Sequence, residues 1–220
     1  MTIVLVLLTF LVIGTATYLA QSHRLHAAPK EAKPAQPLIP IMAGEAGFDV
    51  PVGYRFHPGH TWLCGDGGEH VRIGIDSFAT KVFGKVDHLE VSGLSRWVRQ
   101  GNRLCSITRE GTTAHFMSPI EGVIVAVNHE VQRDPNLIVA DPYKDGWICI
   151  VKSPDMDINL KNLLPQALVG TWMQNGLRRL QAFAAPLGAA TADGGVPIDG
   201  LIAHVDPDVR CGMIHEFFLN

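Results

Sequence analysis

Between Val50 and Val151 the chain is a series of short runs rich in β-branched and aromatic residues, each ended by glycine, proline, asparagine or aspartate. Runs of roughly four to eight such residues between turn formers predict β-strands. Strands this short and this closely spaced predict a small barrel or sandwich, so the central domain is expected to be mainly β. The predicted strands are 60–64, 70–75, 85–91, 103–108, 122–128 and 147–152, with a helical turn over 77–83.

The segment after this domain has a different pattern. Leucine, tryptophan and methionine recur at helical spacing over residues 157–183, which predicts amphipathic helices, with Pro165 dividing two of them or starting the second. Residues 184–220 begin with a stretch rich in alanine, glycine and proline and predict an extended tail. The last residues are strongly apolar, which indicates that they are buried either on this domain or on a partner.

The first twenty residues contain no charged side chain. About twenty apolar helical residues span the hydrocarbon core of a bilayer, so residues 1–21 predict a transmembrane anchor. A cleaved signal peptide is the alternative, but it needs positive charge before its apolar core, and here Arg24, Lys30 and Lys33 come after it. By the positive-inside rule, the anchor crosses the inner (cytoplasmic) membrane once, with the N-terminus out and the domain in the cytoplasm.

Residues 22–47 are rich in proline, including Pro29, Pro34, Pro37 and Pro40. Dense prolines disfavour a helix and favour an extended, semi-rigid spacer, so this segment predicts a linker between anchor and domain. The domain itself is expected over residues 48–156.

The charge pattern excludes nucleic acid as the expected partner. The formal net charge is -3 and there is no polybasic stripe. The four cysteines are widely separated and form no C-x-x-C pair, which fits a reducing compartment better than a disulfide scaffold, although two disulfides stay open at this stage.

Several ordered motifs carry a resemblance to a known family. The stretch begins with Phe56-His57-Pro58-Gly59-His60-Thr61-Trp62, continues with Ile73-Gly74-Ile75-Asp76 and Gly84-Lys85, and ends with Ser118-Pro119-Ile120-Glu121-Gly122 through Asn128, Pro135-Asn136-Leu137 and Asp141-Pro142-Tyr143-Lys144-Asp145-Gly146-Trp147. In this order and spacing the motifs resemble those of H proteins of the glycine cleavage system. The resemblance covers about half of the chain. It implies a lipoyl-domain-like fold (a barrel-sandwich hybrid) of two small packed sheets.

The resemblance also implies a function that this chain has lost. H proteins present one lysine at the tip of a hairpin, and lipoate is joined to it through an amide bond. Counting back from Ser118-Pro119 places that position at Gly111, and no lysine occurs between Lys85 and Lys144. Arg109 is no substitute, because a guanidinium stays protonated and is not an amine nucleophile. No lipoyl cofactor is therefore expected.

Other candidate sites are weak. His57, His60 and Cys64 lie close in sequence, as do His204, Cys211 and His215, but neither spacing matches a zinc pattern, so no metal site is predicted. No phosphate loop, nucleophile elbow or acid/base pair is present, so no catalytic residue is predicted and the chain is not expected to be an enzyme.

The sequence therefore predicts a structural or assembly subunit of an integral membrane complex, respiratory or photosynthetic, that contacts membrane lipid through residues 1–21. One alternative is a membrane-tethered accessory of glycine cleavage or lipoate metabolism, and another is a sensor that binds a metal or ligand through its histidines. Because the family fold is complete by about residue 180, we expect Phe217, Phe218 and Leu219 to dock on a partner.

Overall fold

The computed structural model describes residues 41–43, 48–184, 192–193, 196–197 and 199–218. The predicted anchor, residues 1–21, lies outside the described residues, as do residues 22–40 and 44–47 of the predicted linker. Within the described ranges, no helix combines the length and the apolarity needed to cross a membrane.

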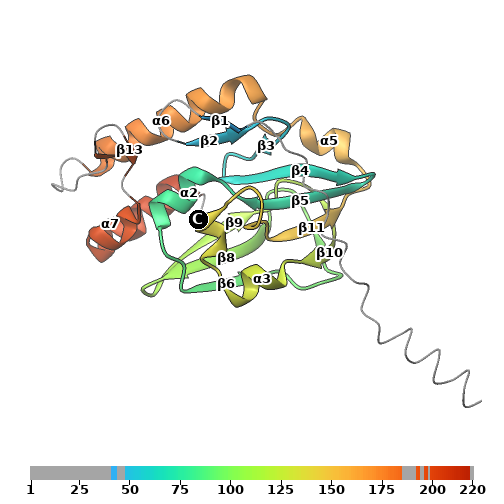
Figure 1. Cartoon of the computed structure of the whole chain (residues 1–220), viewed down its shortest axis with the longest axis horizontal. Coiled ribbons are helices and arrows are strands. Elements are labelled where there is room, and N and C mark those ends of the chain that lie inside the picture. The colour runs from blue at the N-terminus through green and yellow to red at the C-terminus, as the bar shows by residue number, and fades with distance from the viewer. Residues whose placement is uncertain (1–40, 44–47, 185–191, 194–195, 198, 219–220) are drawn as a thin grey trace, which may run out of the picture. The chain divides into compact units, whose positions relative to one another are not determined.

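Two β-sheets form the domain (Figure 1). The larger sheet has the order β3-β4-β5-β11-β10-β7 and the smaller one the order β6-β8-β9. The six strands of the larger sheet are β3 (Arg55–Phe56), β4 (Thr61–Gly67), β5 (His70–Ile75), β7 (Trp97–Val98), β10 (Gly122–Val127) and β11 (Cys149–Lys152). The smaller sheet contains β6 (His88–Val91), β8 (Arg103–Arg109) and β9 (Thr112–Met117). The prediction of a mainly β domain with two small sheets is confirmed in this region.

Two two-stranded ribbons lie outside these sheets. β1 (Ile41–Ala43) pairs with β2 (Asp49–Pro51), and β12 (Ala192–Asp193) pairs with β13 (Val196–Pro197). The predicted linker therefore ends earlier than residue 47, because the apolar run after Pro40 pairs as a strand instead of continuing the proline-rich spacer.

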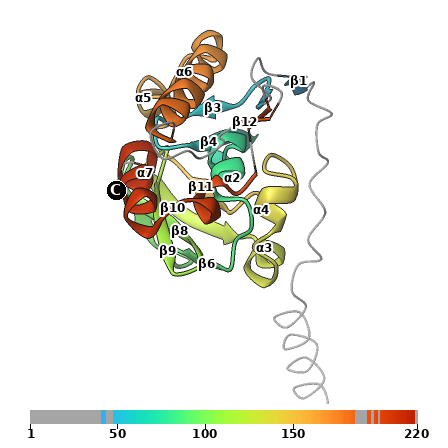
Figure 2. The ribbon, with the colours of Figure 1, turned by 90° about the vertical axis from the view of Figure 1, so that its left-hand side faces the viewer.

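Short helices connect the strands, and the two longest helices, α6 and α7, follow them. The connecting helices are α2 (Ser77–Phe83), α3 (His129–Arg133) and α4 (Leu137–Ala140). The C-terminal region contains α5 (Met156–Leu160), α6 (Gln166–Ala184), η2 (Leu201–His204) and α7 (Pro207–Phe218). Pro165 comes directly before α6, a position where its missing N–H removes no helical hydrogen bond. Figure 2 shows α7 on the side of the domain away from α3 and α4.

The expectation of an extended tail over residues 184–220 is wrong for its last part. Residues 201–204 form η2, and residues 207–218 form the helix α7. Pro207 is the first residue of α7, since proline is favoured in the first turn of a helix.

The core explains why the family motifs have the residues they have. Trp62 is fully buried, and its indole Nε1 donates to the carbonyl of Ile75 at 2.9 Å. A Cβ on Gly74 would lie 2.3 Å from the Trp62 ring, so only glycine fits opposite the indole. These two motif residues therefore form one packing unit between β4 and β5.

The closing motif has a similar structural role around Tyr143. Its hydroxyl donates to the carbonyl of Asp49 at 2.7 Å and accepts from the backbone N–H of Ser77 at 3.0 Å. Burial raises the pKa of the Tyr143 phenol well above its ordinary value, which keeps the hydroxyl neutral and able to donate. Asn128, from another motif, caps the N-terminus of α3, where its side-chain oxygen accepts from the N–H of Glu130 at 3.0 Å.

Candidate functional site

The candidate site is the hairpin of β8 and β9. Strand β9 was not among the predicted strands, although its sequence Thr112–Met117 alternates buried and more accessible residues. Arg109 pairs with Thr112, which leaves Glu110 and Gly111 as a two-residue loop. Both have left-handed backbones, with φ of 49° and 76°. Two left-handed residues in succession are typical of the tight turn that matches the twist of antiparallel strands. The position reached by counting back from Ser118-Pro119 is thus a hairpin tip.

The chemistry of this tip does not fit a lipoyl group. A Cβ built on Gly111 meets no atom within 4 Å, so a side chain here would have space. An amide bond to lipoate nevertheless requires a primary amine, and the loop residues Glu110 and Gly111 supply none. The nearest preceding lysine, Lys85, belongs to the turn before β6, where its ammonium lies 3.4 Å from Asp87.

Hydrogen bonds hold the hairpin tip from the β6 side. The backbone N–H of Glu110 donates to Asp87 at 2.8 Å. This bond, with a smaller contribution from Lys85, holds the pKa of the Asp87 carboxyl below its ordinary value. The Arg109 guanidinium donates to the carbonyl of Phe83 at the end of α2. Arg109 is therefore folded back on the domain and does not project from the tip.

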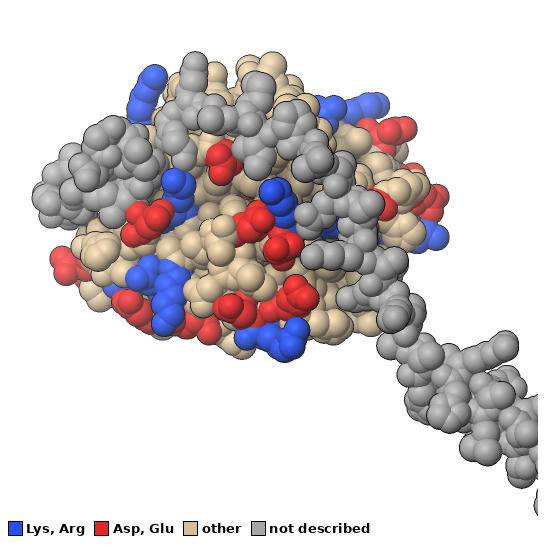
Figure 3. Space-filling view, viewed as in Figure 1, with Lys and Arg blue, Asp and Glu red and all other residues tan. Residues whose placement is uncertain are grey.

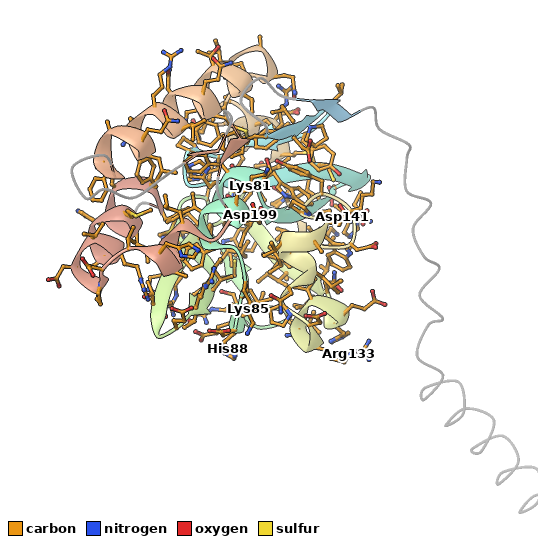
Figure 4. All side chains as sticks on the ribbon, turned by 60° about the vertical axis from the view of Figure 1, so that its left-hand side comes forward. Lys81, Lys85, His88, Arg133, Asp141 and Asp199 are labelled. Carbon is orange, nitrogen blue, oxygen red and sulfur yellow. The ribbon has the colours of Figure 1, made fainter. Side chains whose placement is uncertain are left out.

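Helix α7 contacts the tip from another side. The Arg210 guanidinium donates to the Thr112 hydroxyl at 3.2 Å and lies 3.8 Å from the Glu110 carboxylate. The segment before α7 is fixed to α2, since the N–H of Gly200 donates to the carbonyl of Lys81 at 2.7 Å. Figure 4 shows Asp199 beside Lys81, with Lys85 and His88 farther along the same side of the domain.

Aromatic packing secures α7. Phe218 is fully buried, with its ring centroid 5.4 Å from that of Phe116 and 5.7 Å from that of Phe83. The ring centroid of Phe217 lies 5.9 Å from that of Phe78, and the guanidinium of Arg179 lies over the Phe217 ring, 5.2 Å from its centroid. The expectation that these phenylalanines dock on a partner is therefore wrong, because the domain itself supplies their apolar contacts. Leu219 lies outside the described residues.

His60 serves packing. His60 lies between Phe78 and Trp172, with ring centroids at 4.4 and 4.5 Å, and its Nδ1 is 2.8 Å from the Asp76 carboxylate. Since Trp172 belongs to α6, this stack joins α6 to the β domain. The sequence contains a histidine-x-tryptophan motif but has no signal for the aromatic partner more than a hundred residues later.

The remaining candidate metal ligands are not assembled into a centre. Cys64 lies on β4, and burial raises the pKa of its thiol. His204, Cys211 and His215 are exposed on η2 and α7. Among the residues that the structure describes, no group of three or more histidine, cysteine or acidic side chains is arranged to hold a metal ion. All four cysteines are free thiols, so neither disulfide left open by the sequence forms.

Comparison with known proteins identifies the family. The family model described as glycine cleavage H-protein matches residues 54–174. The chain belongs to the glycine cleavage H-protein family. It is 31% identical over 108 residues to the glycine cleavage system H protein of Prochlorococcus marinus, a match that covers 49% of this chain and 83% of that protein. It is 36% identical over 101 residues to the H protein of Listeria monocytogenes, covering 46% of this chain and 80% of the relative.

A solved structure gives the same result. The crystal structure of the glycine cleavage system H protein from Mycobacterium marinum superposes with a TM-score of 0.50 and 25% sequence identity, covering 58% of this chain and 99% of that one. The match to the family model ends at residue 174, within α6. Helix α7, which contacts the hairpin tip, therefore lies beyond the matched residues.

Proposed function

We propose that this H-protein family member is a non-catalytic, membrane-anchored subunit that holds or assembles an integral membrane complex, with its domain acting as a non-lipoylated interaction module. The observation that carries the proposal is the hairpin tip, where Gly111 replaces an amine and the contacts of Arg210 hold the loop to α7. A tip without an amine cannot form the amide bond on which a carrier depends, so the domain's surface is left as its working part.

The sequence supports the location of this module. Residues 1–21 act as a single-pass anchor in the inner membrane, with the N-terminus out and the domain in the cytoplasm. An anchor gives membrane residence without selecting partners, because lipid is as apolar as the helix. Selection of a respiratory or photosynthetic complex then depends on the folded domain.

A second function is favoured by family membership. In that case the protein is a membrane-tethered accessory of glycine cleavage or lipoate metabolism, which binds the enzymes that H proteins meet without carrying the cofactor. The domain has the scaffold for this role, since the motif residues Trp62, Gly74 and Tyr143 are all in place.

Affinity purification of the tagged full chain from detergent-solubilised membranes tests these functions. We expect integral membrane proteins to co-purify at fixed stoichiometry, measured by quantitative mass spectrometry and native electrophoresis. Recovery of glycine cleavage enzymes in their place would support the second function. Recovery of the chain alone, under detergents that keep known complexes intact, would contradict both.

A matched control separates anchor from domain. A chimera that carries residues 1–40 on an unrelated soluble domain keeps the predicted anchor and the proline-rich segment before β1, and loses the H-protein-like surface. If the domain selects the complex, the chimera should reach the membrane but recover none of the co-purified subunits.

A further inference from the structure

An exposed surface made of arginine and large apolar side chains lies at the loop between β6 and β7 and at the adjoining strand ends. It consists of Leu94, Arg96, Trp97, Arg99 and Arg103, called here the Arg/Trp surface. Leu94 is 62% exposed and Trp97 is 48% exposed, which is unusual for side chains of this size. Neither residue contributes to the core or to the hairpin tip.

Strand geometry directs these side chains outward. Successive residues of a strand point to opposite faces, so buried Val98 leaves Trp97 and Arg99 on the outer face of the sheet. Trp97 pairs with Val123 on β10, and the nearby Val125 is 40% exposed. The apolar part of the surface therefore continues from the loop onto β10.

A polar cavity of about 210 Å³ opens beside this apolar part. Arg96 and Arg103 line it together with Ser92 and Ser106, where β6 pairs with β8. Its volume is several times the ~30 Å³ that a water molecule occupies in the liquid. The two guanidinium groups are the donors that bind a phosphate group well, because guanidinium forms paired hydrogen bonds with phosphate oxygens. The Ser92 hydroxyl donates instead to the carbonyl of Arg103 at 3.5 Å.

The positive charges of this surface are uncompensated by ion pairs. Within the described part of the chain, Arg96, Arg99 and Arg103 form no ion pair. Arg72 and Arg179, in contrast, pair with Asp66 and Glu216. Three unpaired guanidinium groups beside exposed tryptophan and leucine indicate a surface that meets an anionic and partly apolar partner.

Two acidic residues lie near the surface and limit its charge. Glu90 also lines the cavity, where its carboxylate accepts from the Ser106 hydroxyl at 3.4 Å. Glu121 precedes Gly122, the strand partner of Val98. Three arginines against two carboxylates leave the surface positive. Figure 3 shows one face of the molecule, on which acidic and basic side chains are intermixed.

We propose that the Arg/Trp surface rests on the anionic phospholipid headgroups of the membrane, with a lipid phosphate in the cavity between Arg96 and Arg103 and with Leu94 and Trp97 in the interfacial layer. This inference rests on the proposed membrane anchoring, which keeps the domain at a high effective concentration near one bilayer. Tryptophan is enriched at membrane interfaces, and basic residues near an anionic leaflet are attracted to it. An anionic bilayer offers phosphates to the arginines and an interfacial layer to Leu94 and Trp97.

The test uses the full chain reconstituted into phosphatidylcholine vesicles with and without phosphatidylglycerol, each prepared with brominated acyl chains that quench tryptophan. The chain has four tryptophans, so the Trp97 signal is the difference between the wild type and Trp97→Phe. We expect about a twofold loss of the Trp97 signal in anionic vesicles and little loss in neutral ones. The double variant Arg96→Gln/Arg103→Gln should lose the quenching, and Glu90→Gln should strengthen it.

Controls separate this inference from the anchor and from a soluble ligand. Leu168→Ser removes a similarly exposed apolar residue on α6, which is 55% exposed, and should leave the Trp97 quenching unchanged. Carbonate extraction reports the anchor independently, so a chain that resists extraction without Trp97 quenching overturns the lipid contact and leaves the proposed function standing. Loss of quenching on adding inorganic phosphate at constant ionic strength would identify a soluble anion as the occupant and overturn the lipid proposal.

Discussion

Replacement of Phe218 by alanine tests whether α7 is part of the folded domain. The Phe218 side chain is fully buried and contacts the rings of Phe83, Phe116 and His60, with centroid separations of 5.4 to 5.8 Å. These three residues come from the end of α2, from β9 and from the loop before β4. One truncation therefore removes contacts between α7 and three separate parts of the domain.

The expected cost follows from the burial of this ring. Replacing a buried phenylalanine with alanine costs about 3–5 kcal/mol, from lost transfer free energy and from the cavity left behind. Phe218 lies in the last turn of α7, where the helix can move to fill part of the cavity, so we expect about 3 kcal/mol. For a domain of this size each kcal/mol shifts Tm by about 2–4 °C, which predicts a decrease of about 6–12 °C.

Thermal unfolding followed by far-UV circular dichroism, on the full chain in detergent, gives the Tm. Leu168→Ala is the matched control, since this exposed α6 residue should change the free energy of unfolding by less than about 0.5 kcal/mol. If Phe218→Ala melts with the wild type, α7 does not pack on the domain in solution, and docking of the C-terminal segment on a partner would regain its support.

Three further predictions follow from the site, the core and the N-terminal segment. Intact-mass measurement after co-expression with a lipoate ligase should show no lipoyl adduct on the wild type and one adduct on Gly111→Lys. The same substitution should lower the free energy of unfolding by about 1 kcal/mol, because the backbone at this position is left-handed. A lipoylated wild type would refute the alignment. Burial raises the pKa of Cys149 to about 12. The Cys149 thiol therefore ionises first in the unfolded chain, and between about pH 9 and pH 12 it should lower the free energy of unfolding by about 1.4 kcal/mol per pH unit. Burial also raises the pKa of Cys105, which adds to this fall. Cys149→Ala should make the decrease of the free energy of unfolding with pH less steep, and replacement of the exposed Cys211 by alanine should not. The same pH slope in both variants would contradict the raised pKa of Cys149. We expect the domain to resist external protease in intact spheroplasts, and its digestion would show that the predicted cytoplasmic orientation is wrong. We also expect the protein to stay in the membrane on carbonate extraction, and its release would show that residues 1–21 are not an anchor.

Much of the β domain could be predicted from the sequence because its signals are local. The strands over 70–75 and 103–108 match β5 and β8 within one residue, since their β-branched runs end at turn formers. Strand β9 was missed because threonine, alanine and histidine dilute its apolar alternation, and its strand character comes from pairing with β8. Side-chain contacts across the sheet decide such cases more than intrinsic propensity does.

The candidate site was predicted in position but not in surroundings. Counting from a proline turn was sufficient to place Gly111 at the hairpin tip, because hairpin register fixes distances along the chain. The contacts that hold the tip come from Asp87 and Arg210, which are separated from Gly111 by 24 and 99 residues and have no local motif. Long-range contacts of this kind depend on the folded arrangement of the chain, and no periodicity or spacing rule reveals them.

The glycine at the tip and the contacts of α7 involve the same hairpin, and neither disturbs the scaffold. The motif residues support packing: Trp62 fits against Gly74, Tyr143 joins β2 to α2, and Asn128 caps α3. Gly111 contributes to none of these contacts, so the residue at the tip can change without cost to the core. The exposed tip and the buried residues that stabilise the domain are therefore separate. This separation allows Gly111 to occupy the tip and α7 to pack beside it without disturbing the contacts of the motif residues.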